Sequence, residues 1–443
     1  MNDYDRQTSG SQPRPPANGS RPSPVRVVEL DLGKPGELRS PGGSVPTGDF
    51  EKHVLALVRR HGQPLGLVTA TGAEGDEAAL SHMLVEAALQ QLQVSTVAPT
   101  EKAAAPLHRA AGAKVPADRA PVSVIVCTRD RTEMLPACLD SVLRIAYPHL
   151  EVILVDNAPS SDDTERLVRS RYSDRIRYVR EPAPGLSRAR NRGLMVAGGA
   201  ICAFTDDDAL TDPGWVTALV DAFADDTVAC VTGMVLPAEL DTEAQLTAEA
   251  YASGVRGFTP QSWSLRQPLS DPLAQFSPGR FGCGANMAFR TDVLRAMGGF
   301  DPATGTGTPS RGGEDLLAFH QVLTAGHTVT YQPDAIVWHR HRRSMNELAR
   351  QVEGFGIGYT AYLTAAVRHQ PRLLVSLLRH LPNGLWRWYR ANQRRTRQAG
   401  PLLDPGNDDS IRILRRLERR GLRYGPYRYL QSVWQQRHTR PGR

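Results

Sequence analysis

The sequence predicts an α/β protein with a mixed, mainly parallel sheet that is covered by helices on both faces. Two observations predict this fold class. Apolar, strand-like runs alternate with helical patterns from residue 122 to residue 232, and this βαβ order is typical of parallel sheets. The 443 residues include 40% hydrophobic side chains, which is enough for a large core with appended units.

The expected elements of this sheet follow the chain in order. Strands are expected at Val122–Cys127, Val152–Val155, Ile176–Val179, Ile201–Thr205 and Val228–Thr232. Helices are expected at Glu133–Arg144, Asp162–Ser170 and Leu186–Val196, and a further helix starts at Asp212–Trp215, at its proline. Strands of such a parallel sheet are buried on both faces.

Changes in composition divide the chain into five segments. Residues 1–48 are rich in Pro, Gly, Ser and Arg and are expected to be mostly disordered, although Val25–Leu30 could form a strand. The other segments are a small α/β unit at 49–100, a linker at 101–120, the main domain at 121–343 and a helical, Arg-rich C-terminal region at 344–443.

The small α/β unit has three expected elements. Phe50–Leu57 carries helical spacing, Leu65–Val68 looks like a strand, and Glu77–Leu92 is a strong helix pattern. A unit of this size buries too little apolar surface to be stable by itself. We therefore expect it to dock on the main domain.

Polar residues follow three of the expected strands at their carboxyl ends. They are Thr128 and Arg129, Asp156 and Asn157, and the triplet Asp206, Asp207 and Asp208. Ligands of open α/β sheets bind outside the carboxyl ends of the strands, so these residues should converge on one crevice. Three adjacent carboxylates repel one another, and a bound divalent cation offsets that repulsion. The pattern predicts a metal site and, through the metal, a phosphate site.

Cysteine usage and hydropathy limit the class of protein. The five cysteines are an odd number without C-x-x-C spacing, so neither a disulfide framework nor a zinc site is indicated, and a reducing cytoplasm fits best. The N-terminus lacks the features of a signal peptide, and no apolar stretch approaches the roughly 20 residues that span a bilayer. We expect a soluble or peripheral protein.

Positive charge is concentrated at the C-terminus. Residues 371–443 contain 17 Arg, no Lys and 4 acids, a net charge of +13, which leaves −6 for the rest of a chain whose net charge is +7. The segment Leu385–Arg390 mixes aromatic residues with arginines, which suits an anionic membrane surface. A basic face packed on the acidic body of the protein is the alternative. Nucleic acid is not an expected partner, because no reading motif is present.

A set of short motifs between about residues 121 and 341 resembles bacterial inverting glycosyltransferases of family 2, which have the GT-A fold. The resemblance covers about half of the chain. The motifs are Val122–Arg129, Leu154–Asn157, Gly185–Gly193, Phe204–Asp208, Gly284–Arg290, Gly298–Asp301, Gly313–Asp315 and Trp338–His341.

The resemblance implies a hexosyltransferase that uses a nucleotide-sugar donor, a hydroxyl-bearing acceptor and Mn²⁺ or Mg²⁺. The acceptor could be a glycan, a lipid-linked molecule or a small molecule, and it is expected over Ala238–Gly284. The residues implied for the donor nucleotide are Thr128, Arg129, Asp156, Asn157, Arg190, Asn191 and Asp206. The location implied is cytoplasmic, with peripheral attachment to the inner face of the membrane as an option.

The implied metal ligands are the D-x-D pair Asp206 and Asp208, with His339 completing the shell. Two alternatives stay open at this stage: Asp207 as the direct ligand with Asp206 nearer the ribose, and His341 in place of His339.

Asp315 matches the position of the catalytic base in the family, and Glu314 takes that role if the register is off by one. Two other functions are considered. One is a catalytically silent scaffold that binds a nucleotide sugar. The other is a sugar nucleotidyltransferase, although the loop Thr128–Thr132 lacks the glycines of that class.

A helix is expected after the main domain. Ser344–Glu347 forms a capping box, and apolar residues follow it at helical spacing. Gly354, Gly356 and Gly358 interrupt that pattern, at about 1 kcal/mol each relative to alanine. Close packing, approach of the backbone to an acceptor and a kinked helix are the three interpretations that we consider.

Overall fold

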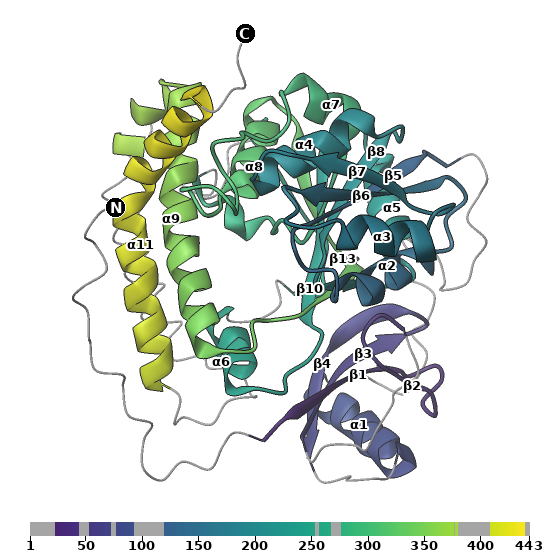
Figure 1. The fold of residues 1–443 in the computed structure, drawn as a ribbon. Helices are drawn as coiled ribbons and strands as arrows, with labels where there is room; N and C mark the ends of the chain where they lie inside the picture. The colour runs from purple at the N-terminus through teal and green to yellow at the C-terminus, as the bar shows by residue number, and fades with distance from the viewer. Residues whose placement is uncertain are drawn as a thin grey trace.

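The computed structural model describes residues 23–43, 53–71, 77–92, 119–252, 257–266, 276–375, 377–379 and 408–438. This part of the chain contains a nine-stranded sheet, a separate four-stranded sheet and a pair of long C-terminal helices (Figure 1). The mixed α/β fold class is confirmed. Most of the expected linker and all of Leu385–Arg390 lie outside the described residues.

The large sheet is parallel in one half and mixed in the other. The parallel strands are β5 (Val122–Thr128), β6 (Leu150–Asn157), β7 (Arg177–Glu181) and β8 (Ile201–Asp206). The mixed half has β12 (Asn286–Arg290) antiparallel to β8 and to β10 (Val228–Pro237), while β13 (Thr328–His339) runs parallel to β10. Two short strands pair antiparallel with β13, namely β9 (Ala209–Thr211) and β11 (Gln261–Ser264).

Both faces of the sheet are covered, as expected. Val124 and Val126 of β5 belong to a core on one face, while Ile125 belongs to a core on the other face. The first core includes residues of α2 (Leu135–Leu143), α3 (Asp163–Arg171) and α5 (Trp215–Asp221). The second includes residues of α4 (Leu186–Val196), α7 (Thr291–Ala296) and α8 (Glu314–Thr324). The alternation of side chains along β5 thus builds two cores from one strand.

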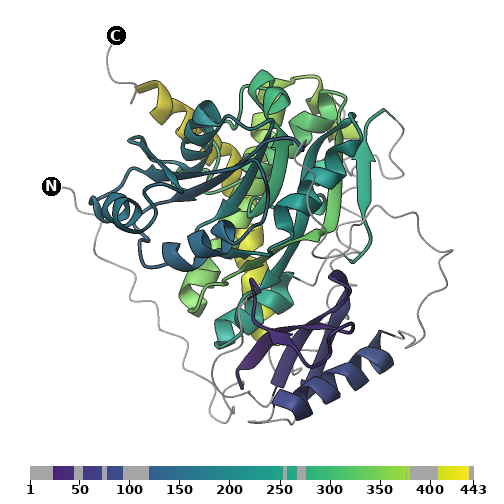
Figure 2. The same cartoon turned by 90° about the vertical axis from the view of Figure 1, so that its right-hand side faces the viewer.

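The N-terminal unit is a sheet with strand order β2-β1-β3-β4 and one helix (Figure 2). Its elements are β1 (Val25–Asp31), β2 (Leu38–Arg39), β3 (His53–Arg60), β4 (Gln63–Thr71) and α1 (Glu77–Gln91). One face packs on α1, and the other shares a core with β10 and β13 of the large sheet. The expected docking on the main domain is confirmed.

One expectation about this unit is confirmed and one is wrong. The strand considered at Val25–Leu30 is present as β1, and Leu38–Arg39 forms the short strand β2. The helix expected at Phe50–Leu57 is a strand from His53 onward. The cause is the burial of β3 on both faces, which gives a continuous apolar run that periodicity cannot assign to strand or helix.

A buried ion pair joins the two sheets. Arg59 of β3 lies 2.7 Å from Glu29 of β1 and 2.5 Å from Asp212, which precedes α5 of the main domain. The three side chains are only 6–12% exposed. The N-terminal unit therefore contacts the segment that directly follows the aspartate triplet and β9.

The C-terminal helices α9 (Met345–His369) and α11 (Asp408–His438) lie side by side (Figure 1). The predicted capping box is present, because the Ser344 side chain accepts a hydrogen bond from the Glu347 backbone. A Cβ atom at Gly356 would lie 2.0 Å from the backbone oxygen of Glu418, so this glycine allows the two helix backbones to approach closely. Close packing is thus the interpretation that the structure supports. None of the described helices is both long and apolar enough to cross a membrane.

Candidate active site

The predicted convergence of polar strand ends is confirmed. Thr128 at the end of β5 stands beside Asp156 of β6, and Cys127 stands beside Asp206 of β8. Parallel pairing in this register brings the carboxyl ends of all three strands to one edge of the sheet.

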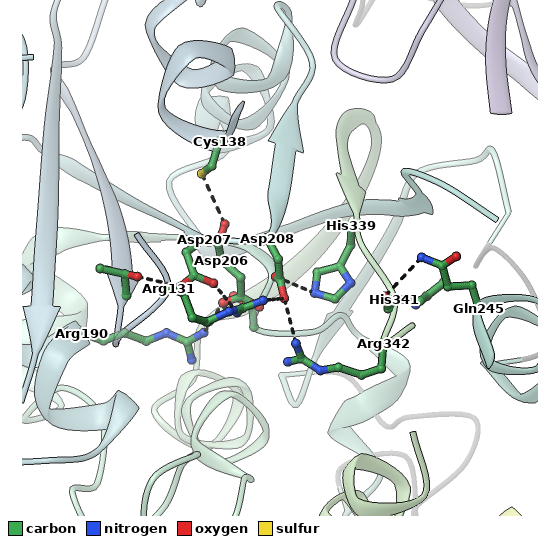
Figure 3. A network of polar contacts seen from close by, with 12 residues as sticks. Arg131, Cys138, Arg190, Asp206, Asp207, Asp208, Gln245, His339, His341 and Arg342 are labelled. Carbon is green, nitrogen blue, oxygen red and sulfur yellow. Dashed lines mark hydrogen bonds and ion pairs between the residues drawn. The ribbon is translucent and has the colours of Figure 1, made fainter. Parts of the chain in front are cut away.

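Asp206, Asp208 and His339 form a group that could hold a metal ion, with their ligand atoms within 4.8 Å of one another. The two aspartates flank the end of β8, and His339 ends β13 (Figure 3). Pairing of His339 with Ala209 of β9 brings the histidine next to the triplet, where its Nε2 lies 3.0 Å from Asp208 Oδ1. Two carboxylates and an imidazole suit Mn²⁺ or Mg²⁺.

Asp207 lies outside this group. Its carboxylate accepts hydrogen bonds from Thr128 at 2.8 Å and from Arg131 at 2.5 Å. Burial raises the pKa of Asp207 to about 7, and Arg131 opposes this increase. The alternative in which Asp207 replaces its neighbours as the direct ligand therefore disagrees with the geometry.

Cationic side chains surround the buried Asp208. Arg131 and Arg342 lie 2.9 Å and 3.5 Å from its Oδ2 atom. Burial alone would raise the pKa of Asp208, but His339 and these arginines hold it well below its usual range. For His339 burial acts in the opposite direction and lowers the pKa. Asp208 raises it by more, so the pKa of His339 lies above its usual value. Asp208 is thus an anion within a cationic shell.

Asp156 has an unused acceptor atom. The residue is fully buried; its Oδ2 accepts a hydrogen bond from the Tyr178 hydroxyl at 2.9 Å, and its Oδ1 has no partner among the described residues. Burial raises the pKa of this carboxyl group. The side-chain amide of the neighbouring Asn157 donates to the Ala183 carbonyl at 2.8 Å and accepts from the Gly185 N–H at 2.9 Å. It therefore holds the backbone that leads into α4.

Two residues expected to hold the donor are used for internal contacts. Arg190 is buried and lies 2.9 Å from Glu314 and 3.4 Å from Asp206. The Asn191 amide donates to the carbonyl of Phe300 at 2.7 Å and accepts from its N–H at 2.8 Å. Helical periodicity could not show the contacts with Glu314 and Phe300, because these partners lie more than 100 positions away in the sequence. Arg190 and Asn191 are thus engaged by other residues of the protein.

The two candidates for the base, Glu314 and Asp315, have different surroundings at the start of helix α8. It begins after Gly313, whose φ of 89° is left-handed, so that Glu314 and Asp315 occupy its first turn. Asp315 is half-buried and accepts the Gly284 N–H at 2.8 Å. Glu314 is buried and held by Arg190, and burial raises its pKa to about 7. The more accessible carboxylate is that of Asp315.

Arg129 and His341 are the remaining predicted candidates. Arg129 is 48% exposed and lies 3.8 Å from Asp130. The His341 ring is hydrogen-bonded to Glu249 at 3.0 Å and is not part of the Asp206, Asp208 and His339 group. Sequence reasoning missed three residues, namely Arg131, Tyr178 and Arg342. Tyr178 lies on β7, which pairs with the strand that carries Asp156, and this expected pairing was the available signal for it. The motifs gave no signal for the two arginines.

Comparisons with known proteins find similarity to glycosyltransferases. Residues 123–298 match the family model of Glycosyl transferase family 2. The chain is 28% identical over 235 residues to a glucosyl-dolichyl phosphate glucuronosyltransferase of Haloferax volcanii, a match that covers 49% of this chain and 69% of the relative. It is 27% identical over 238 residues to polypeptide N-acetylgalactosaminyltransferase 5 of Caenorhabditis elegans, covering 50% of this chain and 37% of the relative.

A pre-mycofactocin glycosyltransferase of Mycobacterium tuberculosis is 28% identical over 221 residues, covering 50% of this chain and 43% of the relative. The chain thus spans less than half the length of two of these relatives. Among solved structures, mannosyltransferase PcManGT from Pyrobaculum calidifontis in complex with GDP-Man and Mn²⁺ is similar at 18% identity, with a TM-score of 0.41 and coverage of 73% of this chain and 77% of that one. The similarity to glycosyl transferase family 2 lies in residues 123–298, which include the aspartate triplet.

Proposed function

We propose that this glycosyltransferase transfers a hexose-type sugar from a nucleotide-diphosphate donor to an acceptor hydroxyl, with a divalent metal ion and with inversion at the anomeric carbon. The observation that carries the proposal is the group Asp206, Asp208 and His339, which could hold a metal ion. It lies at the same sheet edge as Asp156, and Asp315 adds a half-buried carboxylate.

Asp156 is proposed to bind the base of the nucleotide. Its Oδ1 is buried without a partner among the described residues, and an unpaired buried acceptor destabilises the site until a donor group reaches it. An N–H group of a nucleobase supplies such a donor. Tyr178 keeps the other oxygen fixed, so the carboxylate is already oriented before the nucleotide binds.

Asp206, Asp208 and His339 are proposed to hold Mn²⁺ or Mg²⁺. When bound, the ion would supply positive charge to offset the charge that develops on the departing nucleoside diphosphate. Arg131 and Arg342 contribute fixed positive charge on the same carboxylate.

Asp315 is proposed to be the general base that accepts the proton of the acceptor hydroxyl. The Gly284 N–H fixes its carboxylate, and its partial exposure leaves it accessible to an acceptor. A single displacement by that hydroxyl breaks the bond between the sugar and the diphosphate and inverts the anomeric carbon. Gly284 ends the segment Ala238–Gly284, over which we propose that the acceptor lies.

Two alternatives are less well supported. A silent nucleotide-sugar scaffold does not need an accessible carboxylate beside the metal group, and a nucleotidyltransferase does not need a base at Asp315. We also propose that the protein works in the cytoplasm, because all five cysteines are free thiols in the structure.

The proposal is tested with a panel of UDP-, GDP- and dTDP-sugars, measuring both hydrolysis and transfer in the presence of Mn²⁺. At least one donor should turn over. Asp315→Asn should lower transfer by roughly 10²–10⁴-fold, because it removes the base. Its nucleotide affinity should stay near that of the wild type. Asp174→Asn changes an exposed aspartate in the same way and should leave transfer unchanged.

Two results would contradict the proposal. If no donor binds or reacts, the chain is not the transferase described above. If Asp315→Asn loses nucleotide binding as strongly as it loses transfer, Asp315 belongs to the donor site and is not the base.

A further inference from the structure

One face of α11 presents a continuous stripe of exposed side chains. Its members recur at alternating steps of three and four residues, so they lie on one side of the helix. They are Arg416, Arg420, Arg423, Tyr427, Leu430 and Trp434, and all are exposed. The stripe is therefore cationic along its first half and apolar or aromatic along its second half.

The opposite side of α11 is already covered. Leu414, Gly421 and Tyr429 are buried on that side, and a Cβ atom at Gly421 would lie 2.3 Å from a backbone oxygen of α9. The helix is thus anchored to the protein by one side, and the stripe faces away from α9.

The exposure of the apolar half is considerable. Tyr427, Leu430 and Trp434 are 64%, 57% and 61% exposed. Contiguous exposed apolar groups of this size mark interaction surfaces in soluble proteins. Tyrosine and tryptophan are also the residues that concentrate at the boundary between water and lipid.

The charged half points to an anionic partner. Arg416 and Arg423 form no ion pair with any described residue, and Arg420 has only a 3.6 Å contact with Glu353. Among the described residues, the alternative that this basic face packs on the acidic body of the protein therefore does not hold for Arg416 and Arg423, whose side chains are exposed.

A cavity beside the C-terminal end of α11 is also rich in arginine. It measures about 420 Å³ and is lined by Arg188, Pro302, Arg368, Val433, Gln436 and Arg437. The Gln436 amide nitrogen is buried and has no hydrogen-bond partner among the described residues. Three guanidinium groups, of which that of Arg368 also donates to the Tyr429 hydroxyl, and an unused N–H donor suit the oxygens of a phosphate. Arg437, one turn beyond Trp434, also extends the stripe.

We propose that the α11 stripe docks the protein on an anionic phospholipid membrane, with the aromatic half at the lipid interface and the cavity receiving a phosphate headgroup. Cationic and interfacial aromatic residues on one helix face are the combination that binds anionic lipid surfaces. This docking is independent of the transfer reaction. The α11 stripe thus has the combination of arginines and aromatic residues that was expected at Leu385–Arg390.

The test is flotation of the full-length protein with phosphatidylcholine vesicles, prepared with and without phosphatidylglycerol. We expect binding to the anionic vesicles and its loss as salt is raised, because salt screens exposed charges. Arg416→Gln combined with Arg423→Gln should lower the partition coefficient by roughly tenfold or more. Tyr427→Ser combined with Trp434→Ser should lower it by a similar factor, through the loss of interfacial aromatic rings.

Matched controls separate the stripe from general charge and hydrophobicity. Arg166→Gln with Arg169→Gln removes two exposed arginines from α3, and Met195→Ser removes an exposed apolar side chain from α4. Both controls should keep the partition coefficient of the wild type within about twofold, since each changes only general charge or apolarity at a distance from the stripe.

Three outcomes would overturn the proposal: no binding of the wild type to anionic vesicles, equal losses in the control variants, or stripe variants that bind as the wild type does. Binding of the wild type to nucleic acid but not to vesicles would also overturn it. Thermal midpoints equal to the wild type exclude misfolding as the cause of a loss. Arg437→Gln should weaken binding to vesicles that contain phosphatidylglycerol and leave binding to pure phosphatidylcholine vesicles unchanged. This difference would test whether the cavity receives an anionic headgroup.

Discussion

Replacement of Arg59 by methionine tests how strongly the N-terminal unit is tied to the main domain. Arg59 lies between Glu29 and Asp212, with all three side chains at 6–12% exposure. Methionine keeps most of the apolar volume but leaves two buried carboxylates without their cation. Removing one partner of a buried ion pair costs about 3–5 kcal/mol, so we expect a loss of unfolding free energy in that range.

The assay is urea unfolding followed by circular dichroism, with Arg166→Met as the matched control. Arg166 pairs with Asp163 on the surface of α3, where the two side chains are 69% and 54% exposed. An exposed pair contributes only about 0–1 kcal/mol, so the control should shift the midpoint little.

The dependence on pH adds a second check with a defined sign. Burial raises the pKa of Glu29 to about 7 from its usual 4.5, and Arg59 opposes this. Between these two values the folded state binds a proton that the unfolded state has lost. The contribution of Glu29 to stability is therefore full below about pH 4.5 and decreases as pH rises toward 7.

Without Arg59 the pKa of Glu29 should rise further, and the loss should continue to higher pH. The destabilisation of Arg59→Met should consequently be larger at about pH 8 than at about pH 5. An equal loss at both pH values, or a loss no larger than that of Arg166→Met, would refute the reasoning.

Three further predictions concern the helices, the metal group and the nucleotide site. Gly356→Ala should destabilise the protein by at least about 1–3 kcal/mol, because its Cβ would meet a backbone carbonyl of α11. Gly354→Ala should be neutral or stabilising by up to about 1 kcal/mol, because the nearest neighbour of its Cβ would be 3.7 Å away. Thermal unfolding distinguishes the two variants. Chelation with EDTA should abolish transfer, and His339→Gln should weaken Mn²⁺ binding by roughly tenfold or more in calorimetry, while His341→Gln should not. Asp156→Asn should weaken nucleotide binding by about 1–3 kcal/mol in the same assay, because it changes the acceptor of a buried hydrogen bond.

The core of the fold could be predicted because local patterns determine it. Strand β5 places alternate side chains in two cores, and helix α4 places its apolar side chains in one of them. Residues 53–60 could not be assigned to a strand from the sequence. They are buried on one face by α1 and on the other by the large sheet, and these distant partners leave no periodic pattern of polar residues.

The candidate site shows a similar limit. Asp156 and Asp206 could be placed together because strand ends in a parallel sheet share one edge. The choice between His339 and His341 depended on pairing of β13 with β9 and on the distant Glu249. The engagement of Arg190 by Glu314 is also a contact across 124 residues, which no local pattern contains.

Because the two sheets share a core, the N-terminal unit and the main domain fold together, although the candidate active site lies in the main domain alone. Val27 and Leu57 of the N-terminal sheet are packed with Leu236 and Trp338 of the large sheet. A fragment cut at the borders of residues 123–298, or at the start of β5, would leave the main-domain side of that core facing water. Truncation of the N-terminal unit should therefore yield an aggregating protein rather than a smaller active one, and its borders are poor sites for dissecting or fusing this domain.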